Sequence, residues 1–107
     1  MQINFTGLHV DVTPALQQFT RDKFAKLGHC FEHIQSIHVI FEVEKLRHTV
    51  KATLNIPHEQ IAAHAQADDM YIAIDEIVHK LYNQLNKHKE KMLDHRHERD
   101  HRDHGPQ

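Results

Sequence analysis

Residues 37–66, IHVIFEVEKLRHTVKATLNIPHEQIAAHAQ, decide the fold of this chain, because apolar and polar residues alternate along them in successive runs. Alternation with a period of two is typical of strands that cover a core with one face. Residues 45–47 and 57–59 separate the runs, and both segments are short enough for hairpin turns. This stretch therefore predicts an antiparallel meander of strands.

Each predicted strand has one largely apolar face and one more polar face, so the sheet is expected to be covered on one side only. The other side is then open to solvent. The residues predicted to point into the core are Ile37, Val39, Phe41, Val43, Val50, Ala52, Leu54, Ile56, Ile61, Ala63 and Ala65.

Before the meander, the chain begins with a strand and a helix. Residues 2–6 alternate between polar and apolar types, which predicts a half-buried strand. Thr13 is a favoured N-cap residue and Pro14 suits the first helical position, so a helix is expected to begin there. Gly28 is expected to end this helix. Cys30 then falls just past the helix end, where a small, partly buried thiol is expected.

The apolar side of this first helix includes a lysine. Lys23 points into the arc of its apolar residues, which are Leu16, Phe19, Phe24 and Leu27. In one interpretation the aliphatic stem of Lys23 lies along the edge of the core while its ammonium group reaches water. In the other, the ammonium group emerges in a groove beside the helix, next to Lys26.

After the meander, residues 68–92 have the periodicity of one long helix, capped by Asp68 or Asp69. Acidic residues gather in its first turns and lysines in its last turns, an arrangement that suits the helix macrodipole. Its apolar arc consists of Ile74, Ile77, Val78, Leu81, Leu85 and Met92.

The geometry of this helix adds a feature that the dipole does not require. Lys80, Gln84, Lys87 and Lys91 project along one narrow stripe, about 100° around the axis from the apolar arc. A row of cations on a rigid element is what a phosphate-binding surface needs. A merely solvated face is the simpler interpretation of the pattern alone.

The element order β-α-β-β-β-α predicts an α+β fold, a two-layer sandwich. Both helices must share the single apolar face of a four-stranded mixed sheet. The first strand returns through a helix, so it is expected to pair parallel with a later strand through a right-handed crossover. The helices would then lie side by side, with Lys23 and Lys26 facing the lysine stripe across a basic groove.

Length and composition bound the possible functions. A chain of 107 residues fits one domain, predicted over residues 1–93, and residues 94–107 form a polar, histidine-rich tail that is expected to be disordered. The formal net charge of −2 excludes a general basic coat, so any nucleic-acid binding must come from a local patch. No stretch is apolar enough for a membrane span or a signal segment, and the lone Cys30 fits a reducing cytoplasm.

The thirteen histidines suggest a metal or pH sensor as an alternative function. The tail residues His95, His97, His101 and His104 could chelate a metal ion, but they lack the paired cysteines of a structural zinc site, so no metal site is predicted. On the open sheet face, His38 and His64 could lie near one another.

Catalysis finds little support in the sequence. The chain has no phosphate-cradling glycine loop and no nucleophile in a recognisable setting, so neither an enzyme nor a cofactor is expected.

RNA binding can be tested against known modes. An RNA-recognition motif stacks bases on aromatic residues of its open sheet face. Here that face is predicted to carry no aromatic residue, since it consists of Asn4, Thr6, His38, Ile40, Lys51 and Thr53. The α-β-β-β-α part instead resembles the double-stranded RNA-binding domain, which reads backbone shape with lysines near helix ends.

Several motifs resemble a known family over residues 1–95. They are MQINFTG in the first strand, DVTPAL and DKFAKLG around the first helix, VEKLRHTVKATL in the first hairpin, and DDMYIAID and KLYNQLNKHKEK in the last helix. The chain resembles the short form of the ribosome hibernation promoting factor family, which also includes the ribosome-associated inhibitor called protein Y.

The resemblance implies binding to the small ribosomal subunit, in the channel that messenger RNA and transfer RNAs occupy. Members of the family inhibit translation in stationary phase or starvation, without catalysis. The short promoting form acts with a separate modulation factor to join ribosomes into inactive dimers, whereas protein Y keeps single ribosomes inactive and opposes dimerisation. A cytoplasmic protein that is monomeric off the ribosome is expected.

The resemblance also carries over candidate contacts with ribosomal RNA at matching positions. These are Lys23, Lys26, Lys45, Lys80, Gln84, Lys87, His88, Lys89 and Lys91. The tail has roughly the length of the protein Y extension but a different composition, so the alternative of a protein Y type inhibitor stays open. The body of the sequence is more similar to the short promoting factor.

Overall fold

The computed structural model describes residues 2–96, and it describes side chains for residues 2–88. The elements follow in the order β1 (Gln2–Leu8), α1 (Pro14–Cys30), β2 (Ser36–Glu44), β3 (Arg47–Ile56), β4 (Glu59–Ala67) and α2 (Met70–Arg96). The strands form one sheet in the order β1-β2-β3-β4. The predicted element order and α+β class are confirmed.

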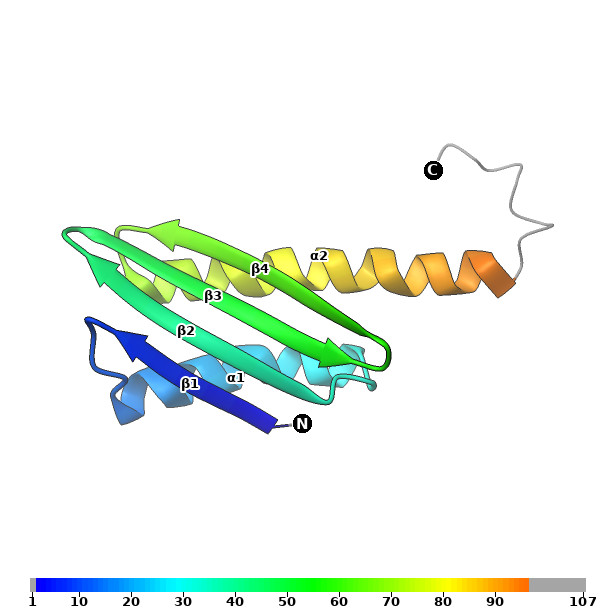
Figure 1. Cartoon of the computed structure of the whole chain (residues 1–107), viewed down its shortest axis with the longest axis horizontal. Coiled ribbons are helices and arrows are strands. Elements are labelled where there is room, and N and C mark those ends of the chain that lie inside the picture. The colour runs from blue at the N-terminus through cyan, green and yellow to red at the C-terminus, as the bar shows by residue number, and fades with distance from the viewer. Residues whose placement is uncertain (1, 97–107) are drawn as a thin grey trace.

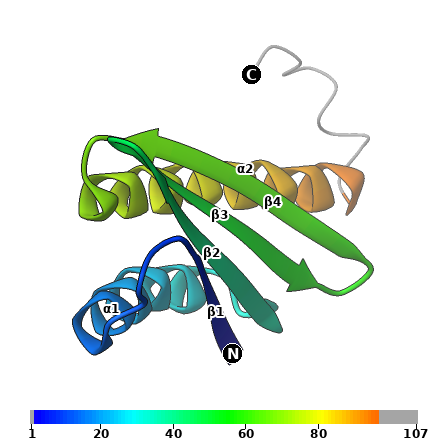
Figure 2. The same ribbon diagram turned by 60° about the vertical axis from the view of Figure 1, so that its left-hand side comes forward.

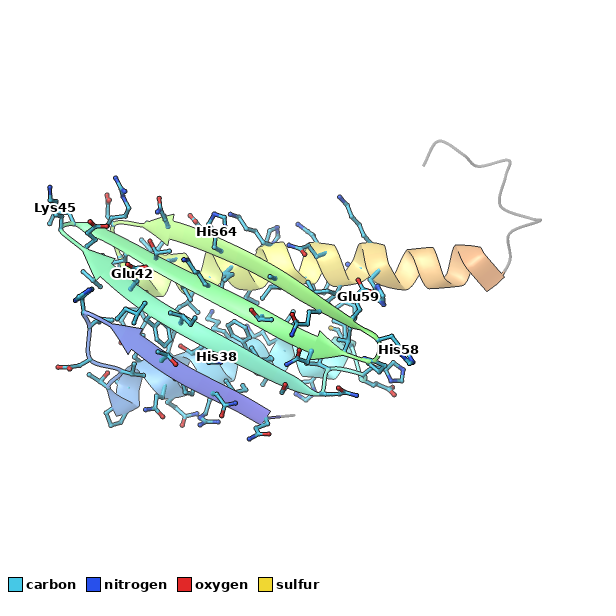
Figure 3. All side chains as sticks on the ribbon, viewed as in Figure 1. His38, Glu42, Lys45, His58, Glu59 and His64 are labelled. Atoms are coloured by element: carbon cyan, nitrogen blue, oxygen red, sulfur yellow. The ribbon has the colours of Figure 1, made fainter. Side chains whose placement is uncertain are left out.

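The pairing of the strands also agrees with the sequence. β1 pairs parallel with β2, and β2, β3 and β4 form an antiparallel meander. Both helices lie on one side of the sheet, α1 behind β1 and β2, and α2 behind β3 and β4 (Figures 1 and 2). The opposite face is open and carries polar side chains such as His38 on β2 and His64 on β4 (Figure 3).

The core lies between the sheet and the helices. The inward residues of β2 and β3 are buried as the alternation predicted, except Val43, which is only partly buried. They pack with Phe24 and Leu27 of α1 and with Ile74, Ile77 and Leu81 of α2. Sequence analysis did not assign Met70 and Ala73 to the core, yet both are buried at the start of α2. Removing this apolar surface from water is the main force that holds the two layers together.

Helix α1 begins as predicted but ends later. The Thr13 hydroxyl accepts a hydrogen bond from the Leu16 amide at 3.1 Å, and Pro14 is the first helical residue. The prediction that Gly28 ends the helix is wrong, because α1 runs through Gly28 to Cys30 and no glycine among the described residues has a positive φ.

Packing explains the longer helix. Leu27 is buried and Phe31 packs against the core, so tertiary contacts hold the turn on both sides of Gly28. The Phe31 amide donates a hydrogen bond to the Leu27 carbonyl at 2.8 Å, which closes the last turn. Cys30 is therefore the last helical residue, and it is exposed instead of partly buried.

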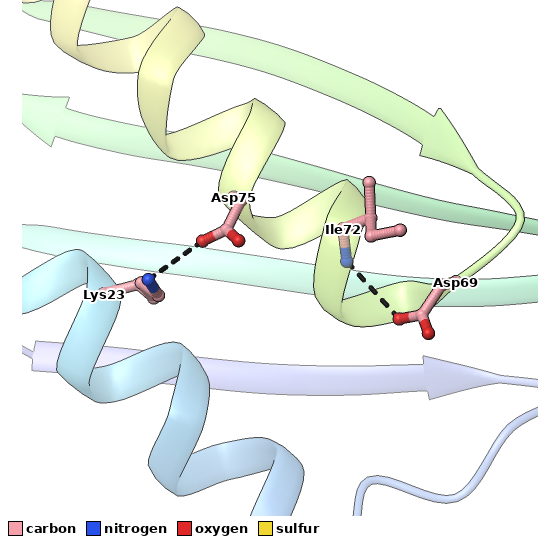
Figure 4. A network of polar contacts seen from close by, with 4 residues as sticks. All are labelled: Lys23, Asp69, Ile72 and Asp75. Carbon is pink, nitrogen blue, oxygen red and sulfur yellow. Dashed lines mark hydrogen bonds and ion pairs between the residues drawn. The ribbon is translucent and has the colours of Figure 1, made fainter.

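Helix α2 begins at Met70, directly after its cap. One carboxylate oxygen of Asp69 accepts hydrogen bonds from the Tyr71 amide at 2.7 Å and from the Ile72 amide at 3.4 Å, so Asp69 is the cap. Figure 4 shows the bond to Ile72. The helix continues to Arg96 and extends past the end of the sheet (Figure 1). The sequence predicts a disordered tail over residues 94–107. Residues 94–96 are instead the last residues of α2, and residues 97–107 lie outside the described residues.

Candidate nucleic-acid interface

The seam between the two helices is filled by an ion pair and aromatic contacts. Lys23 Nζ lies 3.0 Å from Asp75 Oδ1, as Figure 4 shows. Phe19 packs edge-on against Tyr71 with the ring centroids 4.7 Å apart, and Phe31 packs edge-on against Tyr82 at 5.7 Å. Acidic and aromatic side chains of α2 therefore face α1.

The lysine stripe lies on the other flank of α2. The Lys80 ammonium donates a hydrogen bond to the His64 carbonyl at 2.8 Å, and the Gln84 amide donates one to the Ala62 carbonyl at 3.4 Å. Both carbonyls belong to β4, which is an edge strand of the sheet. At 100° per residue, Lys80 is rotated by about 140° from Asp75 around the helix axis.

The predicted basic groove between the helices is therefore wrong. Helix α2 must bury its apolar arc against β3 and β4, and the order of the strands then decides which flank meets α1. The flank that carries Tyr71, Asp75 and Tyr82 meets α1, and the lysine stripe meets the free edge of β4.

Lys23 and Lys26 differ in their surroundings. The Lys23 side chain is half-buried, and its ammonium group lies 5.3 Å from the centre of the Phe19 ring as well as next to Asp75. This arrangement keeps the stem along the core edge, as one interpretation held, but the charge is paired. Lys26 is exposed, and the structure gives its side chain no polar partner among the described residues.

A side chain in the second half of α2 contacts the start of β4. His88 Nδ1 lies 3.3 Å from Glu59 Oε1, and these groups attract each other when the imidazole is protonated. Lys87 is exposed one position earlier. The side chains of Lys89 and Lys91 lie outside the described residues.

Lys45 lies apart from these residues. It occupies the two-residue turn between β2 and β3 with a φ of 57°, and it borders a hollow with Arg47 and Gln66 at that end of the sheet. Figure 3 places Lys45 at one end of the sheet and Glu59 at the other. The structure thus brings Lys80, Gln84, Lys87 and His88 together along one flank of α2, and it leaves Lys23, Lys26 and Lys45 elsewhere.

The histidines of the open sheet face are not neighbours. His38 is level with Ala62 of β4, while His64 lies two residues further along and is separated from β2 by β3. His38 Nε2 instead lies 3.0 Å from the Thr6 hydroxyl. Among the described residues, no three histidine, cysteine or acidic side chains are grouped as metal ligands, and the side chains of all four tail histidines, His95 included, lie outside that range.

Two cations that the sequence analysis did not assign to the site have exposed side chains on the sheet. Lys51 lies on the open face of β3, and Arg47 lies at its start. The signal that could have found Lys51 is the register of the hairpin, which sets it beside His64.

Comparisons with known proteins agree over most of the chain. The family described as Sigma 54 modulation protein / S30EA ribosomal protein matches residues 3–93. A ribosome hibernation promoting factor of Escherichia coli strain K12 is 46% identical over 95 residues, which cover 89% of this chain and 100% of that protein. A protein of the same name from Pseudomonas putida KT2440 is 46% identical over 91 residues, covering 85% of this chain and 89% of the relative.

Two solved structures of related proteins have the same fold. A ribosomal subunit interface protein from Coxiella burnetii superimposes with a TM-score of 0.79 and 42% identity, covering 83% of this chain and 98% of the other. The N-terminal domain of Protein Y from Thermus thermophilus has a TM-score of 0.76 at 20% identity, covering 81% of this chain and 98% of that domain, and so shares the fold. In the described part of the chain, neither helix is long and apolar enough to cross a membrane.

Proposed function

This chain belongs to the Sigma 54 modulation protein / S30EA ribosomal protein family, and from that premise we propose that it is a ribosome hibernation factor that occupies the mRNA and tRNA channel of the small ribosomal subunit. The relatives named ribosome hibernation promoting factor match over nearly their whole length, which supports this function. A protein that works on ribosomes in this way acts in the cytoplasm.

The observation that carries the proposal is the row of exposed side chains on α2. Lys80, Gln84 and Lys87 lie on one flank of a rigid helix that is anchored to the sheet by buried residues such as Leu81 and Leu85. Ribosomal RNA presents a dense array of phosphates, so binding releases counterions and gains free energy without any reaction. The formal net charge of −2 confines this attraction to local surfaces.

The mechanism is competitive occlusion. The folded domain occupies the space that tRNA and mRNA require, and its basic side chains hold it on ribosomal RNA. We assign RNA contacts to the residues predicted from the family resemblance, which are Lys23, Lys26, Lys45, Lys80, Gln84, Lys87, His88, Lys89 and Lys91. Lys23 can contribute only if its ammonium group leaves Asp75 for a phosphate. Lys26 and Lys87 are exposed, and neither has an acidic partner among the described side chains.

Within this function we propose that the protein promotes inactive ribosome dimers together with a separate modulation factor. The identity of 46% to promoting factors along their full length supports this over the protein Y type of inhibitor. A sucrose-gradient profile of stationary-phase ribosomes distinguishes the two by the dimer peak, which the promoting type increases. We expect the free protein to be a monomer.

A charge-neutralising double variant tests the RNA contact. The double variant Lys87→Gln with Lys91→Gln is expected to pellet less with small subunits. The slope of log affinity against log salt concentration should also become less steep, by about one for each lysine that contacts a phosphate. Gln2→Glu with Asn4→Glu changes the net charge equally on exposed positions of β1, so it serves as the matched control. If both double variants bind small subunits as tightly as the unchanged protein, Lys87 and Lys91 of the lysine stripe do not contact ribosomal RNA.

A further inference from the structure

Two lysines lie on either side of the free edge strand β4, one in the sheet layer and one in the helix layer. Lys51 of β3 and His64 of β4 are directly opposed in the hairpin register, and both are exposed on the open face of the sheet. Side chains in such a pair have Cβ atoms about 4.5–5.5 Å apart. The His64 carbonyl in turn accepts the hydrogen bond from Lys80 of α2. Lys51, His64 and Lys80 therefore follow one another from the open face, over the edge, to the helix layer.

This edge is free of carboxylates along its middle. The outward side chains of β4 from residue 60 to residue 66 are Gln60, Ala62, His64 and Gln66, none of which is acidic. The acidic groups lie at the two ends, where Glu59 pairs with His88 and where Glu76 precedes Lys80 by one helical turn. Figure 3 shows Glu59 at the far end of β4 from the side chain of His64. A polyanion that crosses the middle of the edge meets only positive and neutral side chains of β3 and β4, and on α2 it meets Lys80 and Gln84, with Glu76 one helical turn before Lys80.

The groups on this edge are held in place before any partner binds. The Lys80 ammonium uses one of its three donors on the His64 carbonyl, so two donors remain for an anion. The Gln84 amide is likewise fixed on the Ala62 carbonyl and keeps its oxygen and second N–H. A side chain that is already ordered loses less conformational entropy on binding. The small Ala62 side chain leaves the edge open between Lys51 and Gln84.

We propose that ribosomal RNA crosses the β4 edge, so that Lys51 and His64 of the open sheet face belong to the RNA interface together with Lys80, Gln84 and Lys87 of α2. This inference rests on the proposed function and adds the sheet face to it. RNA then wraps one side of the domain instead of contacting the helix layer alone.

The same contacts have a second consequence, which is protection of the edge. Unpaired backbone groups of an edge strand invite pairing with another chain, and Lys80 and Gln84 cover two carbonyls of β4. Protection of the edge requires only the hydrogen bonds that Lys80 and Gln84 donate to β4. It requires neither the charge of Lys51 nor an accessible surface at Ala62. An experiment can therefore separate edge protection from RNA binding.

The test compares two substitutions in one row of the open face. Asn4, His38, Thr53 and Ala62 are in register across the sheet, and Asn4 and Ala62 are exposed on its opposite edges. Ala62→Glu and Asn4→Glu each add one negative charge. Ala62→Glu is expected to weaken binding to small ribosomal subunits by about tenfold or more, because like charges in an interface cost several kcal/mol. Asn4→Glu is expected to change the affinity less than twofold.

A third variant covers the case in which Ala62→Glu fails to fold. Lys51→Gln leaves the backbone and the core untouched, and it is expected to reduce the slope of log affinity against log salt by about one. Circular dichroism of each variant checks folding. If Lys51→Gln keeps the full slope, or if folded Ala62→Glu binds as tightly as Asn4→Glu, RNA does not cross the edge and the contacts serve edge protection only. Failure of the unchanged protein to bind small subunits would instead overturn the proposed function.

Discussion

Lys23 and Lys80 are both candidate RNA contacts, and both are already engaged within the domain. Lys23 forms its ion pair where the side chains of Lys23 and Asp75 are 30% and 54% exposed, so water screens much of the attraction. Lys80 donates to a backbone carbonyl at an exposed strand edge. The first arrangement pairs the lysine charge with a carboxylate. Lys80 has no carboxylate within ion-pair distance among the described residues, although Glu76 lies one helical turn before it. We therefore expect Lys80 to contribute more to RNA binding than Lys23.

The Lys23 ion pair is expected to contribute little to stability. Lys23→Met keeps the aliphatic stem beside Phe19 and removes the charge, so the free energy of unfolding should fall by less than about 1 kcal/mol in urea denaturation. Phe24→Ala, one position away and fully buried, should cost about 3–5 kcal/mol and provides the scale. A loss above about 2 kcal/mol for Lys23→Met would show that the pair is a structural element of the helix seam.

At the scale of elements, periodicity and capping chemistry predicted most of the structure. Alternation identified β2, β3 and β4 because one face of each strand covers the core, and Thr13 identified the start of α1 because its hydroxyl caps the first turn. The end of α1 was not predictable in the same way. Gly28 is a local stop signal, and contacts of Leu27 and Phe31 with distant parts of the chain outweigh it.

Gly28 offers a direct check of this explanation. Because Gly28 is helical and its φ is not positive, Gly28→Ala should raise the free energy of unfolding by about 0.5–1 kcal/mol, through the lower backbone entropy of the unfolded chain. Thermal or urea unfolding measures the change. A helix that ended at Gly28 in the left-handed conformation would instead be destabilised by alanine.

For the molecule as a whole, the sequence located the lysine stripe but not its neighbours. A helical wheel gives the angle between Lys80 and the apolar arc, yet it does not say which flank faces α1. That depends on the strand order β1-β2-β3-β4, which places α2 under an edge strand. The register of β3 and β4 places Lys51 beside His64. The sheet face could therefore be added to the candidate interface only once the strand pairing was known.

Charge distribution then explains how a chain with a formal net charge of −2 can bind RNA. Acidic side chains are spread over α1, the start of α2 and the ends of the strands, while Lys51 of β3 and Lys80 of α2 lie on either side of the middle of β4. Such a protein should not bind polyanions in general, since repulsion opposes every other orientation. Selectivity for one structured RNA site follows from this distribution.

Occupation of the mRNA and tRNA channel can be tested by competition with tRNA on isolated small ribosomal subunits. The subunits are loaded with labelled tRNA and messenger RNA, and the folded protein is added at moderate salt while the bound label is measured. We expect the protein to displace tRNA in a saturable manner, and we expect less displacement as the salt concentration rises. Binding of the protein to the subunit with tRNA still fully bound would contradict occupation of the channel.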